Sequence, residues 1–372
     1  MNIEKFIEII NLDFFAGVPD SQLRPLCDYL MDKYGIDTAH HIIGVNEGNC
    51  VGLAAGYNLA TGKIPVVYMQ NSGEGNALNP IASLLNDNVY GIPCVFVIGW
   101  RGEPGIHDEP QHVYQGKITL NFLDMLDISY MVIDSDTNEN EVWNKYNEFK
   151  KLLEKGKQVA FVIRKNALTS SGKYSYVNDY KLQREEVIRK VLEYSKEDIV
   201  VSTTGKASRE LFEIREENKQ SHKYDFLTVG SMGHSSSIAL SIANMRPNKR
   251  VWVIDGDGAV LMHMGAMAII GATKPNNYIH IVINNAAHET VGGMETVAGK
   301  IDICKIAEAC GYEYVKSVSN MKSFEKALDD VAICKKLSLI EVKCSIGSRK
   351  NLGRPTTTPI ENKEVFINWL RR

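Results

Sequence analysis

Short apolar runs alternate with amphipathic segments along almost the whole chain. Residues 66–70, 94–99, 251–254 and 278–283 are rich in β-branched side chains and lack the polar alternation of a half-exposed strand. Such runs predict strands that are buried on both faces. The segments between them, such as residues 22–34, place their leucines at helical spacing. The alternation predicts parallel sheets that are covered by helices.

The alternation is interrupted once, near the middle of the chain. Residues 166–183 are polar, small and aromatic without a sustained period, which is typical of a linker. We therefore expect an α/β protein with two doubly wound parallel-sheet domains, residues 1–165 and residues 184–372.

Composition narrows the classes of partner and compartment. The chain has 372 residues, 44% of them hydrophobic, and a net charge of -3 with its basic residues dispersed, so we expect no nucleic-acid partner. No apolar run approaches the ~20 residues that span a bilayer, and the acidic N-terminus lacks a signal-peptide layout, so we expect no membrane association. Seven cysteines without a CxxC pair indicate free thiols and a cytoplasmic location.

Two polar motifs directly follow buried strands in the second half of the chain. Asp257 lies in a Gly-rich GDG motif after residues 251–254, where the glycines are expected to form a tight turn that exposes it. Asn285 ends the next strand. The carboxyl ends of parallel strands lie at one edge of a sheet, where ligands bind. Carboxylate and amide oxygens are ligands that Mg²⁺ prefers beside phosphate.

The GDG motif and the NN pair, with 28 residues from Asp257 to Asn285, resemble the fingerprint of thiamine diphosphate-dependent enzymes. The resemblance implies that Asp257, Asn285 and the carbonyl of Ala287 hold the Mg²⁺ that binds the diphosphate. Gly256, Gly258 and Ala259 would line the cofactor. A GDG tripeptide alone is often only a turn, but a strand before each half favours the functional interpretation.

The segment VNEGNCVGLAAGYNLATG places Glu47 at a junction between a strand and a helix. In this family one Glu at such a junction binds the aminopyrimidine ring of the cofactor and promotes loss of its reactive proton, so the resemblance assigns Glu47 both cofactor binding and catalysis. The alternative is an ordinary acid in the first turn of a helix, favoured by the helix dipole.

Further cofactor contacts follow from the same resemblance. The GSMG motif resembles the family's bend that supports the cofactor, with the carbonyl of Gly230 as an acceptor and Met232 as an apolar wedge. Thr203, Thr204 and Gly205 at another strand end would donate hydrogen bonds to the diphosphate. Without the family context, Met232 would be interpreted as a core residue.

The chain lacks the central domain of the longest family members, and motifs such as FAGVPDSQLRPL and GWRGEPGIHDEPQHVYQGKIT resemble the phosphonopyruvate decarboxylases. A substrate with two acidic groups requires cationic and hydrogen-bonding side chains. The predicted loop 101–117 offers candidates for substrate binding: Arg101, His107, Gln111 and Lys117. Candidates for proton transfer are Asp20, His112 and His288. Simple solvent exposure is the alternative for each charged loop residue.

The resemblance thus implies decarboxylation of 3-phosphonopyruvate, a small 2-oxo acid, to phosphonoacetaldehyde and CO₂ in phosphonate biosynthesis. Sulfopyruvate decarboxylation is the nearest alternative, since the two substrates differ little. A nucleotide-dependent oxidoreductase is disfavoured because no GxGxxG motif precedes an acid by ~20 residues. Intact Glu47, Asp257 and Asn285 argue against a non-catalytic subunit that only binds thiamine diphosphate.

The resemblance also implies a homo-oligomer, at least a dimer, in which each active site is shared between two chains. Glu47 would come from one chain, and Asp257 with Asn285 from the other. The small residues at 48–56 suit close packing between domains, and they would equally suit an internal contact between a helix and a sheet.

Overall fold

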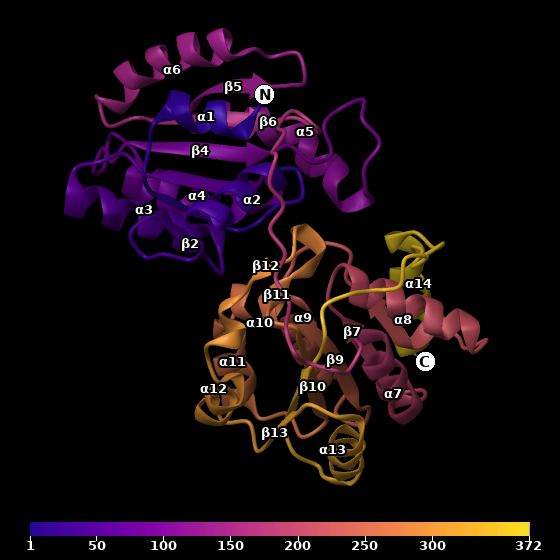
Figure 1. Ribbon diagram of the computed structural model, residues 1–372. Helices are drawn as coiled ribbons and strands as arrows, with labels where there is room; N and C mark the ends of the chain where they lie inside the picture. Colours follow the sequence, from indigo (N-terminus) through magenta and orange to yellow (C-terminus); the bar gives the residue numbers. More distant parts are fainter. Residues whose placement is uncertain (372) are drawn as a thin grey trace. The chain divides into compact units, whose positions relative to one another are not determined.

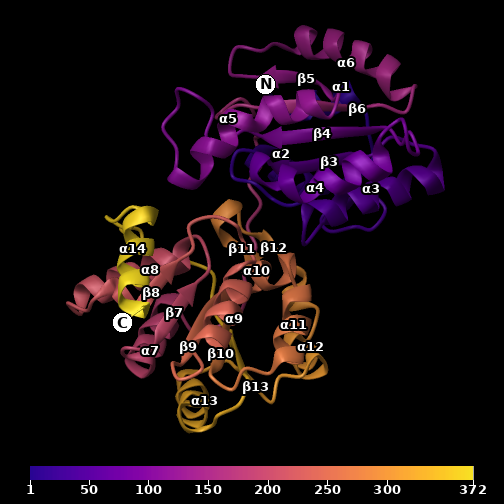
Figure 2. The same ribbon diagram turned by 180° about the vertical axis from the view of Figure 1, so that it is seen from behind.

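A computed structural model describes residues 1–371 and divides the chain into two compact units (Figures 1 and 2). The N-terminal unit comprises Met1–Tyr176 with Val291–Met294, and the C-terminal unit comprises Val177–Thr290 with Glu295–Arg372. Each unit contains one six-stranded parallel sheet. The predicted α/β class with two parallel sheets is therefore confirmed. Within residues 1–371, no helix combines the length and the apolar character needed to cross a membrane.

The sheet of the N-terminal unit has the strand order β2-β1-β3-β4-β6-β5. Its strands are β1 (Phe15–Gly17), β2 (His41–Ile43), β3 (Val66–Gln70), β4 (Cys94–Gly99), β5 (Ser129–Ile133) and β6 (Gln158–Ile163). Its helices are α1 (Ile3–Ile10), α2 (Arg24–Lys33), α3 (Glu47–Thr61), α4 (Glu74–Pro80), α5 (Pro110–Met125) and α6 (Glu139–Leu153).

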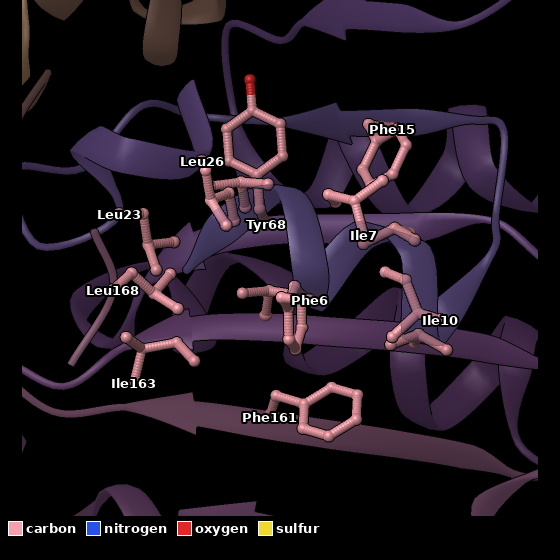
Figure 3. Close-up of a cluster of buried hydrophobic side chains, with 14 of the residues drawn as sticks. Phe6, Ile7, Ile10, Phe15, Leu23, Leu26, Tyr68, Phe161, Ile163 and Leu168 are labelled. Atoms are coloured by element: carbon pink, nitrogen blue, oxygen red, sulfur yellow. The ribbon is translucent and has the colours of Figure 1, made fainter. Parts of the chain in front are cut away.

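The core of the N-terminal unit forms where α1 packs on the sheet, as Figure 3 shows. Phe6, Ile7 and Ile10 lie on one face of α1 because residues three and four apart share a helix face. The Phe6 ring meets the ring of Phe161 edge-on, with 5.1 Å between the centroids. Each such fully buried side chain stabilises the fold by about 1.5–3 kcal/mol relative to an exposed one. This core includes Tyr68 of β3 and Val97 of β4, and so it fixes the strands near whose ends Gln70 and Asp20 lie.

The sheet of the C-terminal unit has the order β13-β14-β10-β9-β7-β8. Its strands are β7 (Ile199–Ser202), β8 (Asp225–Leu227), β9 (Val251–Gly256), β10 (Tyr278–Asn284), β13 (Tyr314–Val318) and β14 (Ser338–Lys343). Its helices are α7 (Arg184–Ser195), α8 (Lys206–Glu217), α9 (Ser235–Met245), α10 (Asp257–Met262), α11 (Gly265–Thr273), α12 (Ile303–Cys310), α13 (Met321–Ile333) and α14 (Pro359–Leu370). Two short strands, β11 (Ala287–His288) and β12 (Met294–Glu295), form a separate ribbon.

The register of the C-terminal sheet aligns three strand ends. Ile254 of β9 lies opposite Ser202 of β7, and Gly256 lies opposite Ile283 of β10. The chain leaves β7 toward β8 on one side and returns to β9 on the other side, so the strand order reverses between β7 and β9. In open parallel sheets, ligands bind at the carboxyl ends of strands at such a switch point.

Two local predictions from the sequence were wrong. The GDG motif forms no tight turn, because Gly256 ends β9 with a φ of -103° and α10 begins at once with Asp257. Asp257 was expected to be exposed, but it is buried, with 3% of its surface exposed. A second helix, α11, follows α10 after a short break.

The second error concerns a loop of the N-terminal unit. The predicted loop 101–117 becomes α5 from Pro110 onward, because the fixed φ of proline suits the first position of a helix. Gln111, His112 and Lys117 therefore lie on a helix.

Candidate active site

Asp257, the metal ligand expected from the sequence, is a buried acid of the C-terminal unit. Its carboxylate is buried at the start of α10, and Oδ2 accepts a hydrogen bond of 2.5 Å from the Thr296 hydroxyl. Burial raises the pKa of Asp257 to about 6, although the Thr296 hydrogen bond opposes the shift. A buried carboxylate without a cationic hydrogen-bonding partner is strongly stabilised by a bound cation.

Asn285 lies in the turn that follows β10. Its Oδ1 accepts from the N–H of Ala287 at 3.1 Å, and its Nδ2 donates to Oε2 of Glu289 at 2.9 Å. Ala286 between them has a φ of 56°, a left-handed conformation that turns the chain back on itself. The side chain of Asn285 is thereby held at both ends.

Glu289 carries two strong ion pairs in addition to its contact with Asn285. Nη1 of Arg184 and Nζ of Lys206 each lie 2.7 Å from one of its carboxylate oxygens. Arg184 also donates two hydrogen bonds of 2.7 Å to Glu210. Burial alone would raise the pKa of Glu289, but Arg184 and Lys206 outweigh burial and lower it.

The oxygen donors of this region fit a hard cation. Asp257 provides a carboxylate, Asn285 an amide oxygen and Ala287 a main-chain carbonyl, which is a set suited to Mg²⁺ beside phosphate oxygens. Among residues 1–371 no cluster of three or more His, Cys, Asp or Glu side chains is arranged for a metal ion. Of the three metal ligands proposed from the sequence, only Asp257 is one of these four residue types. The proposed metal site therefore does not require such a cluster.

The segment after β7 supplies a second group of polar atoms. Gly205 has a φ of 87°, which favours glycine, and directly precedes α8. The N–H of Thr203 donates to the carbonyl of Ile254 at 2.7 Å, so its hydroxyl is the donor that remains for a ligand. Thr204 is half-buried in the same turn.

Gly258 lies where Met232 and His288 converge. A Cβ atom at Gly258 would lie 3.2 Å from Cε of Met232 and 3.4 Å from Nδ1 of His288. The turn that contains Gly230 and Met232 therefore lies close to the beginning of α10, where Ala259 is buried. Burial lowers the pKa of His288 to about 4, which keeps its imidazole neutral at neutral pH.

In the N-terminal unit, Glu47 is the first residue of α3 and is 5% exposed. Its Oε2 accepts a hydrogen bond of 2.7 Å from Nδ2 of Asn76. A side chain at Gly73 would collide with the Glu47 carboxyl group, so the glycine makes room for it. Burial raises the pKa of Glu47, and the Asn76 hydrogen bond offsets only part of this shift.

Asp20 is fully buried beside the end of β4. Its oxygens accept from Nε2 of Gln70 at 2.6 Å and from the N–H of Gln22 at 3.0 Å. A Cβ atom at Gly99 would collide with its carboxylate. Burial raises the pKa of Asp20, although these hydrogen bonds and the positive charge of Arg101 oppose the shift.

The structure brings together Arg101 and His112, two of the residues selected from the sequence, around Asp108. Arg101 forms a bidentate pair with Asp108 at 2.8 and 2.5 Å, and Nδ1 of His112 lies 2.9 Å from the same carboxylate. The Arg101 guanidinium also donates to the hydroxyl of Ser21 at 3.2 Å, next to Asp20. His107 and Lys117 are exposed and Gln111 is half-buried, and the structure records no hydrogen bond between their side chains and the Asp108 group.

Sequence reasoning missed Asn76, Asp108 and Glu289, which contact Glu47, Arg101 and Asn285. Asp108 lies within the predicted loop 101–117, and Glu289 directly follows the candidate residue His288. Their closeness in the sequence to these candidates was the signal that could have identified them. Nothing local identifies their partners, because Arg184 and Lys206 lie 105 and 83 residues from Glu289.

Comparison with known proteins identifies the class to which this geometry belongs. Residues 3–125 match the N-terminal TPP binding domain of thiamine pyrophosphate enzymes, and residues 203–342 match the C-terminal TPP binding domain. The chain therefore belongs to the thiamine pyrophosphate-dependent decarboxylases, which are carboxy-lyases. The predicted family, fold type and enzyme class are confirmed.

Similar curated proteins cover most of the chain. The phosphonopyruvate decarboxylase of Streptomyces viridochromogenes is 32% identical over 94% of this chain and 89% of its own length. That of Streptomyces hygroscopicus is 31% identical over 94% of this chain and 88% of its own. The sulfopyruvate decarboxylase of Methanosarcina acetivorans is 27% identical over 91% and 90%.

Proposed function

We propose that this chain decarboxylates 3-phosphonopyruvate to phosphonoacetaldehyde and CO₂, with thiamine diphosphate and Mg²⁺. The observation that supports this substrate is the 31–32% identity to two phosphonopyruvate decarboxylases over 94% of the chain, against 27% for the sulfopyruvate decarboxylase of similar length. Thiamine diphosphate, when bound, supplies a nucleophilic carbon and an electron sink for the loss of CO₂.

The proposed cofactor contacts in the C-terminal unit are divided between a metal set and a phosphate set. Asp257, Asn285 and the carbonyl of Ala287 would hold Mg²⁺, whose charge would compensate the buried carboxylate. The side chains of Thr203 and Thr204, with the backbone at Gly205, Gly256, Gly258 and Ala259, would face the diphosphate. The carbonyl of Gly230 and the side chain of Met232 would support the organic part of the cofactor.

Glu47 is proposed to act on the pyrimidine ring. Its buried carboxyl group has a raised pKa and a single amide partner, Asn76, so it can hold a proton on Oε1 or share one with a ring nitrogen. The space beside Gly73 supports this assignment, because a larger residue there would displace the carboxyl group.

The acidic groups of the substrate are proposed to meet Arg101 and the residues near it in the N-terminal unit. Arg101 can bind two oxygens of a phosphonate or carboxylate in a fixed plane, and His107, Gln111 and Lys117 would add weaker contacts. Asp20, His112 and His288 would move protons to or from the product carbon. Asp20 suits this role because burial raises its pKa, so its carboxyl group can hold a proton.

The direct test is CO₂ release from 3-phosphonopyruvate, sulfopyruvate and pyruvate, each with and without thiamine diphosphate and Mg²⁺. We expect the highest kcat/KM for 3-phosphonopyruvate and no turnover without the cofactor. A higher kcat/KM for sulfopyruvate would establish the alternative function. Absence of turnover on all three acids, with the cofactor bound, would contradict decarboxylation of these substrates.

We also propose that the active form is at least a homodimer with shared sites. α3 carries Glu47 and exposes Leu59, which is 72% exposed, together with the open glycines Gly52 and Gly56, and this surface suits a second chain. Mixing inactive Glu47→Gln chains with inactive Asp257→Ala chains should restore activity as subunits exchange. If mass spectrometry confirms exchange and activity stays absent, each site is built within one chain.

A further inference from the structure

We propose that Glu289 is a positioning residue that fixes the side-chain amide of Asn285 with its oxygen toward the bound metal. This inference rests on the proposed function, in which Asn285 is a ligand of Mg²⁺. The observation behind it is the contact of 2.9 Å between Nδ2 of Asn285 and Oε2 of Glu289, at a carboxylate that two cations hold in place.

The orientation of the amide follows from hydrogen-bond chemistry. An ionised carboxylate only accepts hydrogen bonds, whereas an Asn amide has a donating end and an accepting end. The amide of Asn285 must therefore turn its nitrogen toward Glu289, and its oxygen must point away. That oxygen accepts one hydrogen bond, from the N–H of Ala287, which leaves its second lone pair for a cation.

The carboxylate of Glu289 is itself held from two directions. Arg184 and Lys206 are the first residues of α7 and α8, and each donates to a different oxygen of Glu289. Arg184 is in turn fixed by its bidentate pair with Glu210. Glu289 has a side chain that is 7% exposed, so little solvent competes for these bonds. The turn that presents Asn285 is thereby tied to two helices.

Substitution of Glu289 by Gln preserves volume and releases this constraint. Gln has one accepting oxygen for the three donors, and its nitrogen can donate to Oδ1 of Asn285 with the amide reversed. A reversed amide presents a donating nitrogen to the metal position. Residues that orient metal ligands typically contribute about 10- to 100-fold to metal affinity.

The test is Mg²⁺ titration by calorimetry at saturating thiamine diphosphate, on the full-length chain. For Glu289→Gln we expect the Kd for Mg²⁺ to rise by about 10- to 100-fold. Glu289→Asp, which still only accepts, should recover part of the affinity. Activity should show a higher Mg²⁺ requirement while kcat at saturating Mg²⁺ changes far less. Glu308→Gln, an equal loss of charge at an exposed position of α12, should leave the Kd unchanged.

A double substitution separates this inference from the proposed function. If Glu289 acts through Asn285, then Asn285→Ala should weaken Mg²⁺ binding, and adding Glu289→Gln should weaken it little further. An unchanged Kd in Glu289→Gln, with a weakened Kd in Asn285→Ala, would overturn the positioning role alone. Fully additive losses would also overturn it. An unchanged Kd in Asn285→Ala would overturn the proposed metal site itself.

Discussion

Two buried acids of the N-terminal unit, Glu47 and Asp20, lie in surroundings opposite to those of Glu289 in the C-terminal unit. In the N-terminal unit, Glu47 faces the amide of Asn76 and Asp20 faces the amide of Gln70, and burial raises both pKa values. In the C-terminal unit, Glu289 faces the cations Arg184 and Lys206, and its pKa is lowered.

The difference shows how neighbours decide what a buried carboxyl group can do. An amide donor only partly compensates the loss of water, so the acid keeps a proton readily and can transfer it. Two cations beside the acid compensate the loss of water fully. The acid is then a fixed negative charge that can orient other groups. We therefore expect substitutions in the N-terminal unit to alter proton transfer, and substitutions in the C-terminal unit to alter metal and cofactor binding.

The largest expected effect is that of Asp257→Ala. The substitution removes the only charged ligand of the proposed metal set, so the loss of Mg²⁺ affinity should exceed the about 10- to 100-fold typical of residues that only orient a ligand. Activity should vanish at ordinary Mg²⁺ and return in part at high Mg²⁺ or high cofactor. Calorimetry of thiamine diphosphate binding provides the measurement. Wild-type cofactor affinity in this variant would contradict the assignment.

Glu47→Gln should leave cofactor binding intact and slow proton transfer. The variant keeps the side-chain volume beside Gly73 but cannot exchange a proton in the same way, so we expect a loss of about 10²- to 10⁴-fold. NMR of hydrogen exchange at the reactive carbon of the cofactor measures the step directly. Exchange at the wild-type rate would refute the role, and weakened cofactor affinity would place Glu47 with the binding groups.

The positions of the principal candidate residues were predicted from the sequence in both units. The buried runs at residues 251–254 and 278–283 predicted β9 and β10, and hence that Asp257 and Asn285 lie near one sheet edge. Glu47 was likewise predicted at the junction that begins α3. These predictions succeeded because apolar runs and strand ends are local features.

The contacts that set the properties of these residues were not predictable in the same way. Glu289 meets partners more than 80 residues distant, and Asp257 meets Thr296, 39 residues away. The buried state of Asp257 was also missed, because a Gly-rich motif suggests an exposed turn. Here the two glycines have other uses: Gly256 completes the strand, and Gly258 leaves room for Met232 and His288.

Arg101→Ala should alter the choice of substrate more than the chemistry. We expect KM for 3-phosphonopyruvate to rise about tenfold or more, as a lost charge-assisted hydrogen bond of about 1.5–3 kcal/mol implies. The slower turnover of pyruvate, which lacks the second anionic group, should change little. Asp108→Asn is the comparison variant, because it keeps Arg101 and loosens the same loop. Equal losses on both substrates, in both variants, would show that Arg101 has a structural role.

The smallest effect on activity, and the sharpest on stability, is expected for Glu74→Gln. Glu74 is buried at the start of α4. Within residues 1–371, neither of its carboxyl oxygens has a hydrogen-bond partner with good geometry. Burial raises its pKa from about 4.5 to about 9, and the nearby Gln115 offsets little of this shift. Between these values the folded state holds a proton that the unfolded state has released. The free energy of unfolding should therefore fall by about 1.4 kcal/mol per pH unit as pH rises.

Because Gln does not titrate, Glu74→Gln should remove this slope and gain stability relative to the wild type from pH 6 to pH 8. Urea unfolding at three pH values in this range measures the difference. Glu8→Gln, at an exposed position of α1, serves as the control and should keep the wild-type slope. In the wild type, the stabilisation that comes from protonated Glu74 should be complete below pH 4.5 and should disappear as pH approaches 9. Equal slopes for the wild type and Glu74→Gln would mean that Glu74 ionises in the folded state. The N-terminal unit would then tolerate a buried charge, contrary to the raised pKa values of its buried acids Glu47 and Asp20.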